Sequence, residues 1–179
     1  MNADKNKSIS RKDAKSAKAA KKGQFTLREV VNKPMKPWLK RLGFQYSEKR
    51  PLPVRLNQLL KDGFSDVGGC VLYAKDSKGF ILRRGLDAAH VSRLSLHIHI
   101  DDEVPRLREN VHAQLRHAIN FAQMATNLMK VQFPQYDFIA SVSIDPKAKS
   151  VTVHPERLTT SSDLDFNNFH QPVLQYRTD

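Results

Sequence analysis

Residues 91–101 of this chain read VSRLSLHIHID, the clearest strand pattern in the sequence. Apolar and polar residues alternate along it, so the apolar side chains would share one face of a strand. These apolar residues are Leu94, Leu96, Ile98 and Ile100. His97 and His99 fall on the opposite face, roughly 6–7 Å apart along the strand. The pattern therefore predicts a strand with one face in the core and the other in solvent.

A long helix is predicted directly after this strand. The acidic residues at 101–103 suit a helix N-terminus, and Pro105 suits its first turn. Apolar residues then recur at spacings of three and four from Leu107 to Met129. We expect one helix that runs to about Lys130 and forms a brace behind a sheet.

Shorter elements on both sides complete the predicted fold. Residues 138–144 alternate as a strand, and a turn at 145–149 returns the chain through Val151 and Val153. Residues 70–73 and 80–82 flank DSKG at 76–79, which predicts a hairpin. A short helix is expected from Pro53 to Gly63. We predict an α+β fold, with a mostly antiparallel sheet of about five strands packed against one long and one short helix.

The positive charge of the chain is concentrated at its N-terminal end. Of the net charge of +12, residues 1–50 hold +11, from fifteen Lys or Arg and four acidic residues. A near-neutral body with a basic arm is typical of proteins that bring the body to a polyanion. We expect four regions: a disordered basic tail (1–24), a basic arm rich in proline and aromatic residues (25–53), an α+β core (54–158) and a polar irregular segment (159–179).

The candidate polyanion-binding residues are cations of the tail and the arm. They are Lys5, Lys7, Arg11, Lys12, Lys15, Lys18, Lys21, Lys22, Lys36, Lys40 and Arg41. Trp38, Phe44 and Tyr46 lie between cations of the arm. Such aromatic residues can stack on nucleic-acid bases or enter a membrane interface. The structural alternative is that Trp38, Leu42 and Phe44 pack the arm onto the body.

Other functional signals are weak. His97 and His99 can begin a metal site or a pH-responsive surface, but no ligand cluster with recognisable spacing accompanies them. The sequence contains no phosphate-binding loop, nucleophile elbow or dinucleotide fingerprint, so we expect a protein that is not an enzyme and has no cofactor. Cys70 is the only cysteine, which excludes an intrachain disulfide and predicts a buried thiol. Without a signal peptide or a long apolar run, we expect a soluble intracellular protein.

The layout resembles that of rhabdovirus matrix proteins, particularly the short basic ones of plant-infecting members. The similarity lies in the Lys-rich start MNADKNKSISRKDAKSAKAAKKG, in SRLSLHIHID leading through Val104 and Pro105 into a helix, and in the strand pair DFIASVSID and SVTVH. The Pro-Pro-x-Tyr budding motif of many animal-virus members has no match here, so no budding role is carried over.

The resemblance implies a virion structural protein of the host cytoplasm. Arg11-Lys12 and Lys21-Lys22 resemble a loose bipartite nuclear-import signal, which gives the nucleus as a further location. Such a protein self-associates and links a nucleocapsid to an anionic membrane. The alternative is a nucleic-acid-binding regulatory or packaging protein that combines its cations with Trp38, Phe44 and Tyr46.

Overall fold

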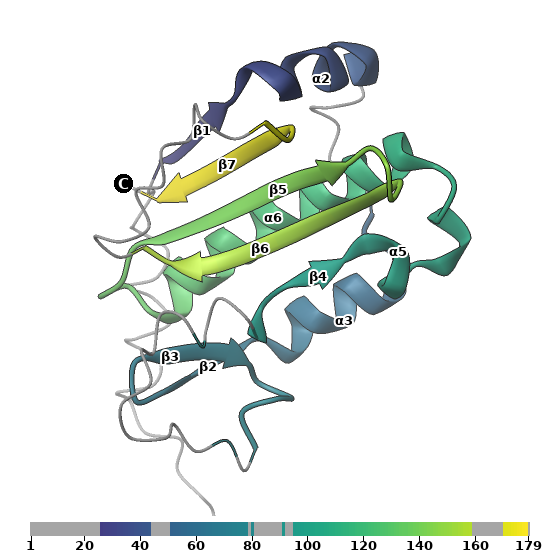
Figure 1. Cartoon of the computed structure of the whole chain (residues 1–179). Coiled ribbons are helices and arrows are strands. Elements are labelled where there is room, and N and C mark those ends of the chain that lie inside the picture. The colour runs from purple at the N-terminus through teal and green to yellow at the C-terminus, as the bar shows by residue number, and fades with distance from the viewer. Residues whose placement is uncertain are drawn as a thin grey trace, which may run out of the picture.

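The structure is a computed structural model that describes residues 26–43, 51–78, 80, 91, 95–158 and 170–178. An antiparallel five-stranded sheet is covered on one face by a long helix, α6 (Figure 1). In spatial order its strands are β1 (Leu27–Val31), β7 (Val173–Thr178), β5 (Phe138–Asp145), β6 (Ser150–Arg157) and β4 (Ile98–His99). The predicted fold class, helices packed with an antiparallel sheet of five strands, is confirmed.

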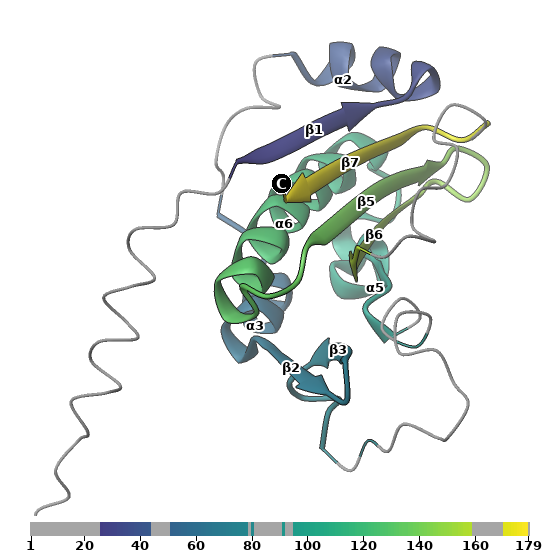
Figure 2. The ribbon, with the colours of Figure 1, turned by 90° about the vertical axis from the view of Figure 1, so that its left-hand side faces the viewer.

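Helices and a second, smaller sheet surround this main sheet. The helical elements are η1 (Lys33–Met35), α2 (Lys36–Leu42), α3 (Val54–Asp62), α5 (Ile100–Glu103), η3 (Pro105–Leu107) and α6 (Val111–Gln132). The small sheet contains β2 (Phe64–Val67) and β3 (Cys70–Tyr73). Figure 2 shows α2 beside β1, and α3 at the other end of the molecule near the small sheet. None of the helices in the described residues is long and apolar enough to cross a membrane.

The core lies between α6 and the sheet face that this helix covers. Fully buried α6 side chains include Leu115, Phe121 and Met129. They meet alternate residues of the strands, among which Val142 and Ile144 are also fully buried. The predicted strand pair formed by β5 and β6 is confirmed. Its alternation holds because every second side chain must enter the core.

The C-terminal strand β7 differs from the irregular segment that we expected over residues 159–179. β7 lies between β1 and β5 and pairs with both. Leu174 and Tyr176 point into the core and are at most 2% exposed, whereas Arg177 on the other face is half-buried. The alternation is only six residues long and contains Gln and Arg, so the sequence pattern is weak. β1 is likewise a strand of the main sheet, so this part of the arm at 25–53 is not a separate region.

The strand predicted over residues 91–101 is much shorter in the structure. Only Ile98 and His99 form β4, which pairs with β6. Val91 and Ser95 are helical, and α5 begins at Ile100 because the acidic residues that follow favour a helix start. The predicted division of faces still holds for the described positions, since Ile98 is buried and His99 is exposed. Residues 92–94 lie outside the described part.

The predicted long helix is interrupted near its start. Val104 leaves helical geometry (φ −136°, ψ 72°), as residues that precede proline tend to do. The short η3 follows, and α6 begins only at Val111, where the side chain of Asn110 accepts a hydrogen bond from the Ala113 amide. The helix ends at Gln132, two residues beyond the expected end.

The predicted hairpin of residues 70–73 and 80–82 is replaced by another pairing. β3 pairs with β2, and Gly68 and Gly69 form the turn with φ of 63° and 85°. Two successive positive φ angles suit a tight hairpin turn, so this glycine pair joins β2 to β3. Phe80 is not in a strand, and residues 81 and 82 lie outside the described part. The helix predicted from Pro53 to Gly63 is confirmed as α3, and Cys70 is fully buried as expected.

Candidate functional site

The described part of the basic arm is a rigidly attached element of the fold. Asn32, which is 2% exposed, precedes η1 and binds three backbone groups. Its Oδ1 accepts hydrogen bonds from the amides of Met35 (3.1 Å) and Val173 (2.9 Å), and its Nδ2 donates to the carbonyl of Gln171 (2.8 Å). With Met35 and Leu42 buried, these bonds hold η1 and α2 against β7.

Four exposed cations project from this element. We call them the cationic surface: Lys33, Lys36, Lys40 and Arg41. The three lysines are spaced by three and four residues, so they follow one side of the helical segment. No acidic residue occurs in the sequence between Glu29 and Glu48. None of the four forms an ion pair with any residue that the structure describes.

Trp38 attaches α2 to α6. Its ring lies 5.4 Å from the ring of His112 and packs against the core while remaining half-buried. The Arg41 guanidinium lies 5.9 Å from the Trp38 ring centroid, a cation–π distance. Trp38 and the buried Leu42 therefore pack this part of the arm onto the body. Phe44 and Tyr46 lie outside the described residues.

The cations predicted in the tail are also outside the described residues. They are Lys5, Lys7, Arg11, Lys12, Lys15, Lys18, Lys21 and Lys22. The structure therefore brings together only the arm's predicted cations, Lys36, Lys40 and Arg41, and adds Lys33, which sequence reasoning missed. Its spacing of three from Lys36 is a signal that could have identified it.

A second polar group lies at the opposite edge of the sheet, where β4 meets β6. The Nε2 atoms of His97 and His99 are 3.0 Å apart. His154 joins them, with its ring 5.2 Å from that of His97 and nearly perpendicular to it. We call these three residues the histidine cluster. Sequence reasoning missed His154 because its proximity depends on the pairing of β4 with β6, two strands far apart in the chain.

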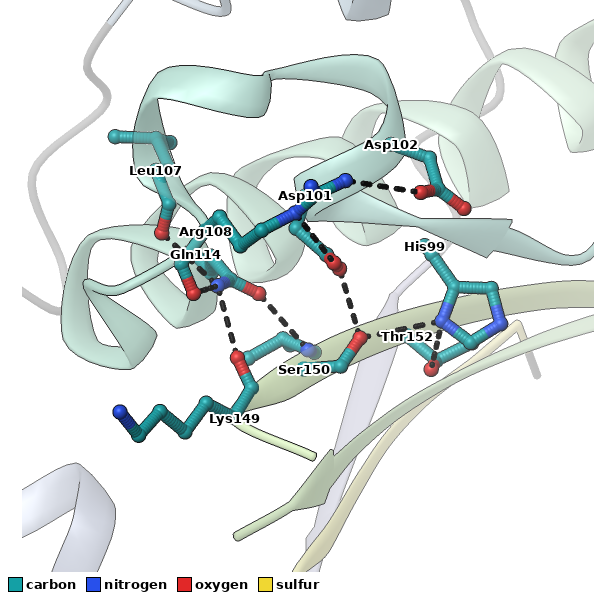
Figure 3. A network of polar contacts seen from close by, with 10 residues as sticks. His99, Asp101, Asp102, Leu107, Arg108, Gln114, Lys149, Ser150 and Thr152 are labelled. Carbon is teal, nitrogen blue, oxygen red and sulfur yellow. Dashed lines mark hydrogen bonds and ion pairs between the residues drawn. The ribbon is translucent and has the colours of Figure 1, made fainter. Parts of the chain in front are cut away.

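Hydrogen bonds connect this cluster to an acidic residue of α5 (Figure 3). The hydroxyl of Ser150 donates to Oδ1 of Asp101 at 2.7 Å, and its oxygen lies 3.2 Å from Nδ1 of His99. Thr152 Oγ1 is 3.5 Å from the same nitrogen. Since the Ser150 proton is directed to the carboxylate, its oxygen accepts the Nδ1 proton of His99. This arrangement leaves the His99 Nε2 as an acceptor facing His97.

A buried glutamine supports Ser150 and Asp101 from the side of α6. Gln114 is fully buried, and its Nε2 lies within 3.1 Å of three carbonyl oxygens, those of Leu107, Arg108 and Lys149. Its Oε1 accepts the amide of Val151 at 2.9 Å. Figure 3 shows how these bonds join the start of β6 to the segment before α6. The histidine cluster is thus held by a connected framework.

The two polar groups have different chemistry. The cationic surface can contact phosphate oxygens, whereas the cluster presents imidazole nitrogens. Partial burial and the neighbouring His99 lower the pKa of His97, which favours its neutral form. Within the described residues, no three or more His, Cys, Asp or Glu side chains are arranged to hold a metal ion. Comparison with protein-family models, curated proteins and solved structures finds no match to this chain.

Proposed function

We propose that this is a non-enzymatic, matrix-like structural protein that self-associates and bridges a ribonucleoprotein and an anionic membrane through its basic N-terminal region. The observation that carries the proposal is the charge distribution. Nearly all of the net charge lies in residues 1–50, and the part of this region that the structure describes ends in the cationic surface of η1 and α2. Self-association rests on the resemblance alone.

The surroundings of the cationic surface support binding of phosphate groups. Exposed cations that have no ion-pair partner among the described residues keep their full charge for an external anion. The helical spacing of Lys33, Lys36 and Lys40 provides a row of contacts, and Asn32 holds the row rigidly to the body. A polyanion bound to this row would therefore hold the whole domain in a defined position.

The position of Trp38 favours this function over base-specific recognition. Its ring is already engaged by His112 on one element and by Arg41 on another. Lysine contacts to phosphate position a protein on nucleic acid but do not read bases. We therefore expect binding that depends on charge and salt and is indifferent to nucleotide sequence. A packaging or regulatory protein that stacks bases on Trp38 is the alternative.

The first test compares two triple variants of the full-length protein. Lys36→Gln/Lys40→Gln/Arg41→Gln removes three cations of the cationic surface, and Arg55→Gln/Lys61→Gln/Lys75→Gln removes three exposed cations elsewhere. Binding of mixed-sequence single-stranded RNA is measured at several salt concentrations. Each phosphate contact on a single strand contributes about −0.7 to the slope of log K against log salt, so the first variant should have a slope shallower by about 2. Equal changes in both variants would contradict a defined surface.

The membrane half is tested by co-sedimentation with vesicles. Wild-type protein should pellet with phosphatidylcholine vesicles that contain phosphatidylserine and should remain in solution with phosphatidylcholine alone. The Lys36/Lys40/Arg41 variant should bind less than the control triple variant. Equal binding to neutral and anionic vesicles would overturn the proposal that the protein binds an anionic membrane. Sedimentation velocity over a range of protein concentrations tests self-association, which a monomer at every concentration would exclude.

Trp38→Phe distinguishes the alternative function. Phenylalanine keeps an aromatic ring for packing on His112 but offers a smaller stacking platform and a weaker cation–π partner. We expect RNA affinity to stay within about twofold of wild type, because phosphate contacts carry the binding. A loss well beyond that, with unchanged thermal stability, would favour the nucleic-acid-binding regulator.

A further inference from the structure

The histidine cluster contains two ring nitrogens in direct contact with each other. His97 and His99 are exposed, and their Nε2 atoms are 3.0 Å apart. Two imidazole nitrogens that each lie about 2.0–2.1 Å from one cation are about 3 Å apart when the angle at the cation is near 90°. The observed separation is that of the hydrogen bond that links the two nitrogens. A cation bound by both takes the place of the shared proton, and His97 then carries its proton on Nδ1. The separation therefore also suits two neighbouring ligands of one ion. This comparison uses geometry alone and is independent of the cationic surface.

Hydrogen bonds around His99 favour the tautomer that a metal ligand needs. The Asp101 carboxylate accepts the Ser150 proton, and Ser150 in turn accepts the Nδ1 proton of His99. This places the His99 lone pair on Nε2, the atom that faces His97. Metal-binding histidines usually have such a partner on their second nitrogen, which fixes the ring and raises its basicity.

We propose that His97 and His99 form a two-histidine binding site for a late first-row divalent cation, with Cu²⁺ and Ni²⁺ preferred. Imidazole is a good ligand for these ions, and tetragonal geometry with angles near 90° is typical of them. Ser150 and Asp101 are positioning residues that hold His99. Because the described residues provide no third ligand in place, water fills the other positions and the affinity is modest.

The site is reachable from solvent and adjoins negative charge. Both imidazoles are exposed on the sheet face opposite α6, and β4 is the edge strand. Asp101 is half-buried and is connected to His99 through hydrogen bonds of Ser150. Arg108 forms an ion pair with Asp101, with 4.0 Å between its Nε and a carboxylate oxygen. His154 packs edge-on against His97 and limits the movement of that ring.

The test is isothermal titration of untagged, chelator-treated full-length protein with Cu²⁺, Ni²⁺, Zn²⁺ and Mg²⁺. We expect one ion per chain, affinity in the order Cu²⁺ above Ni²⁺, and no binding of Mg²⁺. His97→Ala and His99→Ala should each weaken Ni²⁺ binding at least tenfold. Ser150→Ala should weaken it about tenfold while both ligands remain. His170→Ala, which removes an exposed histidine outside the cluster, should leave the affinity unchanged.

A spectroscopic readout separates ligation from folding. Electron paramagnetic resonance of the Cu²⁺ form should show coupling to two imidazole nitrogens in the wild type and to one in His97→Ala, with both proteins equally folded by circular dichroism. The proposal is overturned if wild type binds none of the late transition ions. It is also overturned if His97→Ala and His99→Ala retain wild-type affinity, or if His170→Ala loses as much as they do.

Discussion

The two faces of the five-stranded sheet use the same strands for different purposes. On the face toward α6, the alternate residues Val142, Ile144 and Val153 are fully buried. On the other face, their sequence neighbours Ser143 and His154 are half-buried, and His99 of the edge strand is exposed. Burial of apolar area makes the first face the main source of stability. The second face carries polar side chains in place of this apolar area.

This division is not uniform across the sheet. Near β7 the second face is covered, since Ile139 is 1% exposed and Gln175 is 5% exposed. Near β4 it is open, and the histidine cluster lies there. The contrast teaches that side-chain alternation assigns a residue to a face, whereas its position across the sheet decides whether that face is accessible.

The largest expected difference between the faces comes from a pair of adjacent residues on β5. Ile144→Ala removes a fully buried side chain from the α6 face and should reduce the free energy of unfolding by about 3 kcal/mol, because it leaves a cavity. Ser143→Ala, one residue earlier on the opposite face, should change it by less than about 0.5 kcal/mol. Urea unfolding followed by circular dichroism measures both. Similar losses at the two positions would mean that both faces stabilise the fold.

The next largest loss in the free energy of unfolding is expected at Gln114, a buried polar residue on the α6 side of the sheet. Gln114→Leu removes the acceptor of the buried Val151 amide and the donor to three carbonyl oxygens. Unsatisfied buried groups should lower the free energy of unfolding by about 2 kcal/mol. Gln123→Leu, at a half-buried position of the same helix, is the control and should stay near wild type. Hydrogen exchange should also be faster at the Val151 amide in Gln114→Leu alone.

The start of α6 should have a smaller influence. Asn110→Ala removes the side-chain cap of the Ala113 amide and should cost about 1 kcal/mol. Asn127→Ala, at an exposed position inside the same helix, should be neutral or slightly stabilising because alanine favours helix. Thermal unfolding compares the two variants. If they melt at the same temperature, the cap does not contribute to holding the helix on the sheet.

The smallest effect is expected at an ion pair that touches neither face. Lys149 donates to Glu109 at 2.8 Å, and this bond lowers the pKa of Glu109. Any stability from the pair is present above the ordinary pKa of glutamate and is lost as the pH falls through the lowered pKa. Both side chains are exposed, so Glu109→Gln should be indistinguishable from wild type in urea unfolding at pH 7. A clear loss that high salt abolishes would contradict this expectation.

Much of the architecture was predictable because it depends on short-range patterns. The alternation in residues 138–144 predicts β5, and the glycine after residue 62 predicts the end of α3. The start of α6 was not predictable in the same way, because acidic residues and Pro105 are also consistent with the short α5 and η3. β7 is too short for a reliable pattern and becomes a strand only through its neighbours, whereas the pattern over residues 91–101 predicted more of a strand than β4 provides.

The candidate site was predictable only in part. The four cations of η1 and α2 can be read from the sequence. The two-residue spacing that places His97 and His99 on one face of a strand can be read from it as well. The contact between Trp38 and His112 cannot, because 74 residues separate them in the chain and no local signal pairs them. The same applies to the link from Ser150 to His99.

The sequence by itself determined the separation of charge from core, the identity of α6 as the covering helix and the faces on which most side chains lie. These features follow from composition and from periods of 2.0 and 3.6 residues, which are local properties of the chain. Only the tertiary structure decided that, among the described residues of 91–101, Ile98 and His99 alone join the sheet, and that His154 lies beside His97. Strand partners and register are set by packing between distant segments, and a local pattern carries no information about which segment will be the neighbour.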